Sequence, residues 1–185
     1  MLCILTLLQL KSRPRHALRS RFNMLLNLII AISKTTGLQG PTIVFVQGAF
    51  QGKNSYKELH GSLHSRGYAT VHPTLPTCSN FDDTDFRRRT IQDDAIAVRS
   101  DIERLVLVEQ KEVVLLMHSY GGLVGSEAVT EELTRAHREQ RGLPGGVTRL
   151  FYIASFIMDV GETIVGRFGD PTVGNDIFVS GSSKA

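Results

Sequence analysis

The chain has 185 residues, 42% of them hydrophobic, which suffices for one globular domain with a sizeable core and excludes a disordered composition. The net charge of +3 hides an asymmetry, because residues 1–57 carry eight basic and no acidic side chains, against 13 basic and 18 acidic ones in the remainder. The globular part is therefore mildly acidic, which argues against nucleic acid as a partner. The two cysteines, Cys3 and Cys78, exclude a disulfide framework and show no metal-ligand spacing.

The first forty residues hold two apolar runs on either side of a basic stretch. The runs "MLCILTLLQL" and "MLLNLIIAIS" are each shorter than the ~18 residues that a membrane span needs, so no span is expected. Basic residues and serines without acids are typical of an organelle transit segment. We predict that residues 1–40 are a leader and linker, either disordered or transit-like. The predicted location is cytoplasmic, with a mitochondrial address as the alternative.

Strands and helices alternate after Pro41. Short apolar runs typical of buried parallel strands occur at residues 42–46, 68–73, 112–117 and 148–155. Apolar residues at helical spacing lie between them, most clearly at Ile91, Ala95, Val98, Ile102 and Leu105, and a further helix is predicted from Leu123 through Leu133 and beyond. The alternation predicts an α/β fold with a mostly parallel sheet of about four strands and flanking helices.

The domain predicted from this pattern covers residues 41–165, and residues 166–185 form an irregular tail. One basic cluster, Arg87-Arg88-Arg89, lies in the loop after the second strand and has no aromatic platform around it. We predict that it is a solvated loop.

The stretch "LLMHSYGGLVG" at residues 115–125 raises the question of function. Ser119 follows a buried strand, and ligands of open α/β sheets bind at the carboxyl ends of the strands. A nucleophile elbow, G-x-S-x-G, needs small residues around its serine. Gly121 and Gly122 supply them on the helix side, whereas Met117 replaces the strand-side glycine. The alternative is that Ser119 merely caps the following helix.

The loop after the first strand offers the other half of such a site. An elbow serine needs two backbone N–H groups to hold the oxyanion of the reaction intermediate. In "VQGAF", Gly48 allows a close approach, and Ala49 can supply one N–H. Tyr120, which follows the serine, can supply the other.

Four segments resemble the α/β-hydrolase superfamily, in the branch whose elbow contains MHSYGG: "TIVFVQGAF", "SRGYATVHPTLP", "VVLLMHSYGG" and "RLFYIASF". The resemblance implies a partial α/β-hydrolase fold over roughly residues 41–165. It also implies hydrolysis of a small ester or thioester-type substrate by Ser119, without cofactor or metal. Met before the His-Ser pair resembles the usual elbow of this branch. The oxyanion loop departs from the family, which usually has His-Gly where this chain has Gln47-Gly48.

The family's acid and base follow the serine in chain order. Asp159 follows the fourth strand and is the candidate acid. His137 is the only histidine after Ser119, and it stands some 18 residues along the predicted helix, about 27 Å away at ~1.5 Å per residue. It is therefore out of reach. His72, at the end of the second strand, is the remaining candidate base, and its alternative role is that of a polar strand-end residue.

The chain accordingly resembles a hydrolase truncated before its acid and histidine part, since ordinary family members run on for two more strands and two more helices. Three readings stay open. The chain is a shortened hydrolase, or a catalytically inactive relative that binds a small molecule or a partner, or one half of a site completed by a second chain. An unpaired sheet edge invites association, so self-association is expected.

Overall fold

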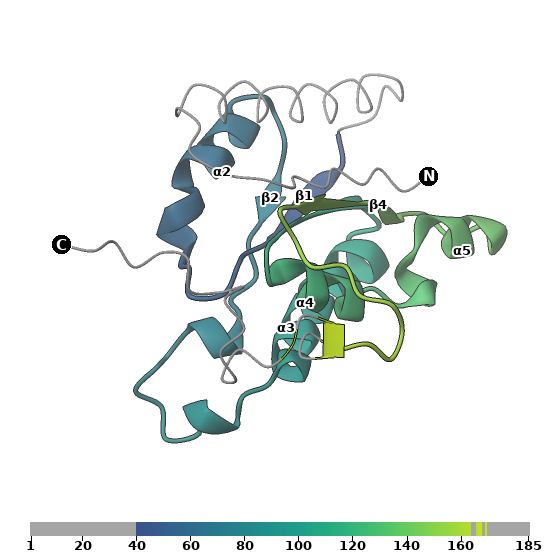
Figure 1. Ribbon diagram of the computed structural model, residues 1–185. Coiled ribbons are helices and arrows are strands. Elements are labelled where there is room, and N and C mark those ends of the chain that lie inside the picture. The colour runs from purple at the N-terminus through teal and green to yellow at the C-terminus, as the bar shows by residue number, and fades with distance from the viewer. Residues whose placement is uncertain (1–39, 164–165, 168, 170–185) are drawn as a thin grey trace.

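The computed structural model describes residues 40–163, 166–167 and 169, and its core is one parallel sheet (Figure 1). The strands lie in the order β2-β1-β3-β4, and every neighbouring pair is parallel. The strands are β1 (Thr42–Val46), β2 (Thr70–Val71), β3 (Glu112–His118) and β4 (Gly146–Ile153). The helices are α2 (Lys57–His64), α3 (Ile91–Glu103), α4 (Gly121–Ala128) and α5 (Arg135–Gln140). The predicted α/β fold with four parallel strands is thus confirmed.

Helices cover the sheet on both faces, because β1 and β3 are apolar on both sides. Alternate residues such as Val44 and Leu115 pack against α3 and α4, whereas Ile43 and Phe45 pack on the other face against Leu63 of α2. Figure 1 shows α2 on one side of the strands and α3 and α4 on the other. The carboxyl ends of β1, β3 and β4 therefore share one edge of a three-layer unit.

The helix α3 forms where the apolar spacing predicted it. Its first turn is closed by a capping box between Thr90 and Asp93, which satisfies backbone N–H groups that have no partner within the helix. The buried stripe continues past Glu103 into a π-helical turn over Arg104–Val108. The sequence pattern indicated the stripe but not this change of helical pitch.

The predicted helix after Ser119 is wrong in its length. Helix α4 ends at Ala128, Val129 and Thr130 are extended, and α5 begins separately after Thr134. Thr134 accepts a hydrogen bond from His137 N–H and forms an isolated parallel bridge with Val147. The bridge to the sheet thus replaces the helix at this point, although the apolar spacing continues through it.

Two further predictions need correction. The strand predicted over residues 68–73 is only Thr70–Val71, because it pairs on one side alone and Pro73 follows. The side chain of Arg89 is not solvated as predicted. It is 17% exposed, donates to the carbonyls of Pro76 and Ser79, and pairs with Asp83 at 2.5 Å. Arg89 therefore holds its loop together.

Several predictions lie outside the described residues. The leader over residues 1–39 and most of the tail over residues 166–185 are among them. Self-association through the sheet edge also stays a prediction. None of the helices in the described part of the chain is long and apolar enough to cross a membrane.

Candidate functional site

Ser119 sits on a sharp turn between β3 and α4. Its backbone has φ 52°, in the left-handed region that non-glycine residues rarely adopt. Its N–H donates to the Ile153 carbonyl at 3.2 Å, and its carbonyl accepts from Ser155 Oγ at 2.7 Å and from Phe156 N–H at 3.2 Å. Contacts with the end of β4 therefore maintain the strained conformation.

The alternative role of Ser119 as a helix cap is not observed. The N-cap position of α4 is Tyr120, and no side chain caps this helix end. Among the described residues, none forms a hydrogen bond with Ser119 Oγ. The hydroxyl is therefore uncommitted at the carboxyl edge of the sheet.

Glycines let the backbone close around this turn. A Cβ on Gly121 would lie 2.3 Å from the Val46 carbonyl oxygen, and one on Gly122 would lie 2.4 Å from the Phe156 carbonyl oxygen. Both contacts are with backbone, which cannot move aside as a flexible side chain can. The elbow therefore requires glycine at both positions.

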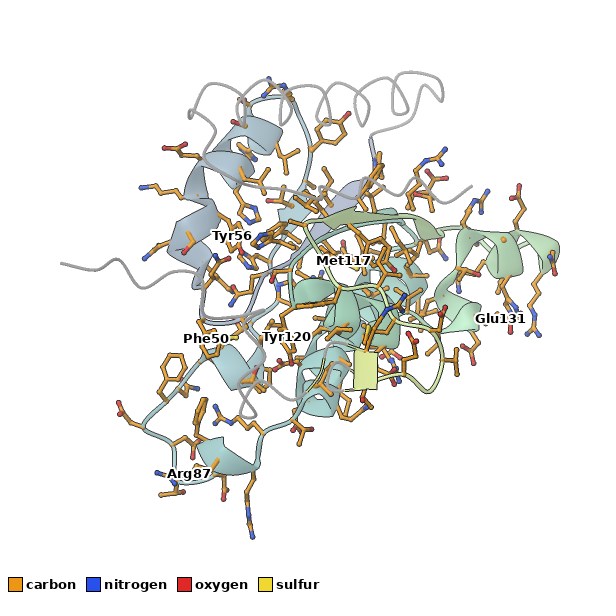
Figure 2. The ribbon with its side chains drawn as sticks, viewed as in Figure 1. Phe50, Tyr56, Arg87, Met117, Tyr120 and Glu131 are labelled. Atoms are coloured by element: carbon orange, nitrogen blue, oxygen red, sulfur yellow. The ribbon has the colours of Figure 1, made fainter. Side chains whose placement is uncertain are left out.

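The structure also explains how Met117 replaces the usual strand-side glycine. A Cβ on Gly125 would lie 2.4 Å from Met117 Sδ, so the thioether occupies the space above a glycine of α4. Met117 is fully buried there, near the centre of Figure 2. Gly125 of α4 thus provides the room that the usual strand-side glycine would provide, and the turn can form with methionine at position 117.

The loop over residues 47–51, here called the oxyanion loop, faces Ser119. A Cβ on Gly48 would lie 3.3 Å from Ser119 Cβ, which shows how closely the loop approaches. The Gly48 N–H donates to Tyr56 Oη at 3.1 Å. Within the described part of the chain, the N–H groups of Ala49 and Tyr120 have no acceptor. These are the two donors that the sequence predicted.

A chain of polar side chains supports the loop from the α2 side. Gln47 is buried, donates to the Gln51 carbonyl, and receives a hydrogen bond from His72 Nε2 at 2.9 Å. His72 Nδ1 meets His60 Nε2 at 3.0 Å, and His60 Nδ1 meets Thr70 Oγ1 at 3.1 Å. Gln47 thus has a defined role in place of the family's usual histidine.

The two histidines of this hydrogen-bonded row have lowered pKa values. Burial, followed by the neighbouring His60 and Lys53, lowers the pKa of His72 to about 4. Burial also lowers the pKa of His60. Both rings are therefore neutral near pH 7. Both ring nitrogens of His72 form hydrogen bonds, one with His60 and one with Gln47, so neither is directed to Ser119.

Asp94 is a site residue that the sequence analysis missed. It is completely buried and accepts hydrogen bonds from Thr77 N–H at 2.9 Å, Thr77 Oγ1 at 2.5 Å and Tyr120 Oη at 2.9 Å. Burial, reinforced by this carboxylate, raises the pKa of Tyr120. Figure 2 shows Tyr120 on the α3–α4 side of the sheet and Tyr56 on the α2 side. One signal was available, because Asp94 stands beside Ala95 on the apolar stripe of α3.

The candidate acid and the downstream histidine lie apart from this cluster. The Asp159 side chain is 88% exposed and lies 3.9 Å from Arg167. His137 lies in the first turn of the separate helix α5, near the amino end of β4, where Thr134 bridges Val147, and its ring lies 3.4 Å from Glu131. His137 is therefore at the opposite end of the strands from Ser119. The bridge between Thr134 and Val147 places it there, and the long helix predicted from the sequence does not form.

The described residues around Ser119 show neither a metal-binding group nor a general base. No group of three or more His, Cys, Asp or Glu in the described residues could hold a metal ion. In that part of the chain, no histidine or carboxylate forms a hydrogen bond with Ser119 Oγ. The described site therefore consists of a nucleophile candidate, two candidate oxyanion donors and their supports.

Comparison with known proteins points to one family. The sequence model of a family described as "Alpha/beta hydrolase family" matches residues 43–180. The alpha/beta hydrolase nvfD of Aspergillus novofumigatus is 32% identical over 130 residues, which are 69% of this chain and 48% of that protein. A probable hydrolase, R7, of a Phoma species is 30% identical over 123 residues, 66% of this chain and 46% of that protein. The chain spans about half the length of these curated relatives.

Proposed function

Because this chain belongs to the alpha/beta hydrolase family, we propose that it takes part in hydrolysing a small ester or thioester-type substrate, with Ser119 as the nucleophile. The observation that carries the proposal is the left-handed backbone of Ser119, φ 52°, on a turn closed against the oxyanion loop. A strained residue that leaves its hydroxyl uncommitted is typical of a nucleophile elbow.

The chemistry follows from this arrangement. Ser119 Oγ attacks the carbonyl carbon and gives its proton to a base, while the N–H groups of Ala49 and Tyr120 stabilise the negative oxygen. The C–O or C–S bond then breaks, and the leaving group takes up a proton. Water hydrolyses the resulting acyl-serine and restores the hydroxyl.

The proposal places the general base outside the described residues. No described histidine meets Ser119, and a serine hydroxyl is a weak nucleophile without a base. Asp159 is the carboxylate that we assign to the acid position, because it follows β4 at the edge of the sheet that carries Ser119. Its exposed side chain could receive a histidine from a segment packed over that edge.

Covalent labelling tests the proposal. A fluorophosphonate ester should label the full chain once, at Ser119, under native conditions. Ser119→Ala should abolish the label, whereas Ser65→Ala, at the end of α2, should leave it unchanged. A label that survives in Ser119→Ala, or a folded chain that takes no label, would contradict the proposal.

A second function is favoured by the absence of a base among the described residues. In this reading the same edge of the sheet binds a small molecule or a partner without turnover. An ester substrate analogue would then bind saturably in both the original chain and Ser119→Ala, and neither would release product. Calorimetric titration alongside the labelling experiment separates the two functions.

A further inference from the structure

Tyr56 lies where the oxyanion loop, the elbow strand and the helix α2 meet. Its hydroxyl contacts three groups: Gly48 N–H at 3.1 Å, His118 Nδ1 at 2.9 Å and Gln51 Oε1. Gly48 and Gln51 belong to the oxyanion loop, and His118 precedes the nucleophile. No described side chain other than Tyr56 joins the loop and the elbow strand through a single atom in this way.

The single hydrogen of the Tyr56 hydroxyl determines the direction of each of its hydrogen bonds. A tyrosine oxygen has one hydrogen and two lone pairs. The hydrogen goes to Gln51 Oε1, a carbonyl oxygen that can only accept, and one lone pair accepts the Gly48 N–H. The second lone pair faces His118 Nδ1, so this nitrogen carries a hydrogen and donates it. All three positions of the hydroxyl are filled.

The direction of these bonds has a consequence for the site. Since the Gly48 N–H is bound to Tyr56, it cannot serve the oxyanion, and Ala49 N–H is the next donor along the loop. Burial lowers the pKa of His118, so its ring is neutral near pH 7 and its one hydrogen lies on Nδ1. The ring of Tyr56 is itself held, because its centroid lies 4.4 Å from that of Phe45 in β1.

We propose that Tyr56 is a positioning residue, which fixes the oxyanion loop against the elbow and so aims the Ala49 N–H at the reacting carbonyl. It acts through the backbone and touches no substrate. The catalytic part of this inference rests on the proposed function, whereas the structural part stands on the contacts alone. The hydrogen-bonded side chains of Gln47 and His72 also hold the loop, so loss of Tyr56 Oη should loosen the loop without unfolding it.

The test substitutes Tyr56→Phe, which removes the hydroxyl and keeps the ring on Phe45. Tyr152→Phe is the matched control, because it likewise removes only a phenol hydroxyl, and the hydrogen bond of that hydroxyl with Ser126 Oγ, at 2.8 Å, lies away from the loop. Amide hydrogen exchange followed by NMR on the full chain should show Gly48 N–H protected in the original protein and in Tyr152→Phe. In Tyr56→Phe this protection should fall by about tenfold or more, and the Ala49 amide resonance should move.

The second measurement is the rate of fluorophosphonate labelling as a function of probe concentration. Complete loss of one oxyanion donor costs about 10²- to 10³-fold in rate, so a misaimed donor should lower the maximal labelling rate of Tyr56→Phe by about tenfold or more. The concentration that gives half the maximal rate should not change. A merely structural role would change neither value in a folded variant.

The two measurements separate the inference from the function on which it draws. If the original chain takes no label, the proposed function fails, and the exchange measurement still decides whether Tyr56 fixes the loop. Unchanged protection of Gly48 in Tyr56→Phe would overturn the inference. So would a labelling rate equal to that of the original chain in a protein that does label.

Discussion

The turn that carries Ser119 and the oxyanion loop that faces it lie in contact, but they are held in different ways. Around the turn, backbone packs directly on backbone, as Gly121 against Val46 and Gly122 against Phe156 show. The oxyanion loop is held mainly by side chains, through Gln47, Tyr56 and His72. One half of the site therefore tolerates no added atom, whereas the other depends on polar groups that can be removed one at a time.

This difference separates stability from function in the site. Close backbone contact cannot be restored by a rearranged side chain, so damage to the turn should unfold the protein. A lost hydrogen bond in the oxyanion loop leaves the layers of the fold packed. It should change the direction in which the Ala49 N–H points. The following substitutions test the contrast, beginning with the largest expected effect.

The elbow glycine should be the most sensitive position. Gly121→Ala places a Cβ 2.3 Å from the Val46 carbonyl oxygen, and we expect a loss of about 3 kcal/mol or more in the free energy of unfolding, or no folded protein. Gly61→Ala is the control, because it lies within α2 with nothing within 4 Å of the new Cβ. It should stabilise the chain by about 0.5–1 kcal/mol. Urea unfolding of both variants checks the pair, and a stable Gly121→Ala would refute the view of the turn.

Asp94 should come second. Asp94→Ala leaves donors of the half-buried Thr77 and Tyr120 without their acceptor, and we expect a loss of about 3 kcal/mol in the free energy of unfolding. The neighbouring Asp93→Ala removes only the exposed half of a capping box and should cost clearly less. Thermal melts of the two variants compare them. Equal losses for the two variants would mean that the hydrogen bonds of Asp94 with Thr77 and Tyr120 add little to the free energy of unfolding.

The smallest expected effect is a loss of stability at low pH, which comes from His72 beside the oxyanion loop. Because burial lowers the pKa of His72 to about 4, the unfolded chain binds more protons than the folded chain between that value and the ordinary histidine pKa of about 6.5. Stability is therefore complete above about pH 6.5 and falls as the pH drops towards 4. The partly exposed ring limits the loss to the order of 1 kcal/mol.

Two variants isolate this contribution. His72→Gln removes the titrating ring and should flatten the dependence of unfolding free energy on pH between 4 and 6.5. His64→Gln, at an exposed position of α2, is the matched control for the loss of an imidazole ring. Urea unfolding at a series of pH values gives the slopes. Identical slopes for the original chain and His72→Gln would show that the buried histidine chain carries no such linkage.

The fold could be predicted from the sequence because its signals are local. The strands β1 and β3 and the helix α3 lie where the sequence indicated, since burial on both faces leaves a continuous apolar run and burial on one face of a helix leaves a readable period. The same spacing failed after Ala128, where apolar residues continue at helical intervals but Thr134 bridges the sheet. A period records which residues are buried and not which partner buries them.

The sequence by itself determined the position of Ser119 and of the oxyanion loop, because both follow directly from the ends of predicted strands. Only the tertiary structure decided what holds them. His118 and Tyr56 are 62 positions apart, and Tyr120 and Asp94 are 26 apart, so no local pattern links either pair. The space beside Met117 likewise comes from Gly125, which lies in the helix α4. Local periodicity encodes the elements, whereas hydrogen bonds and close contacts between distant residues exist only after the layers have packed.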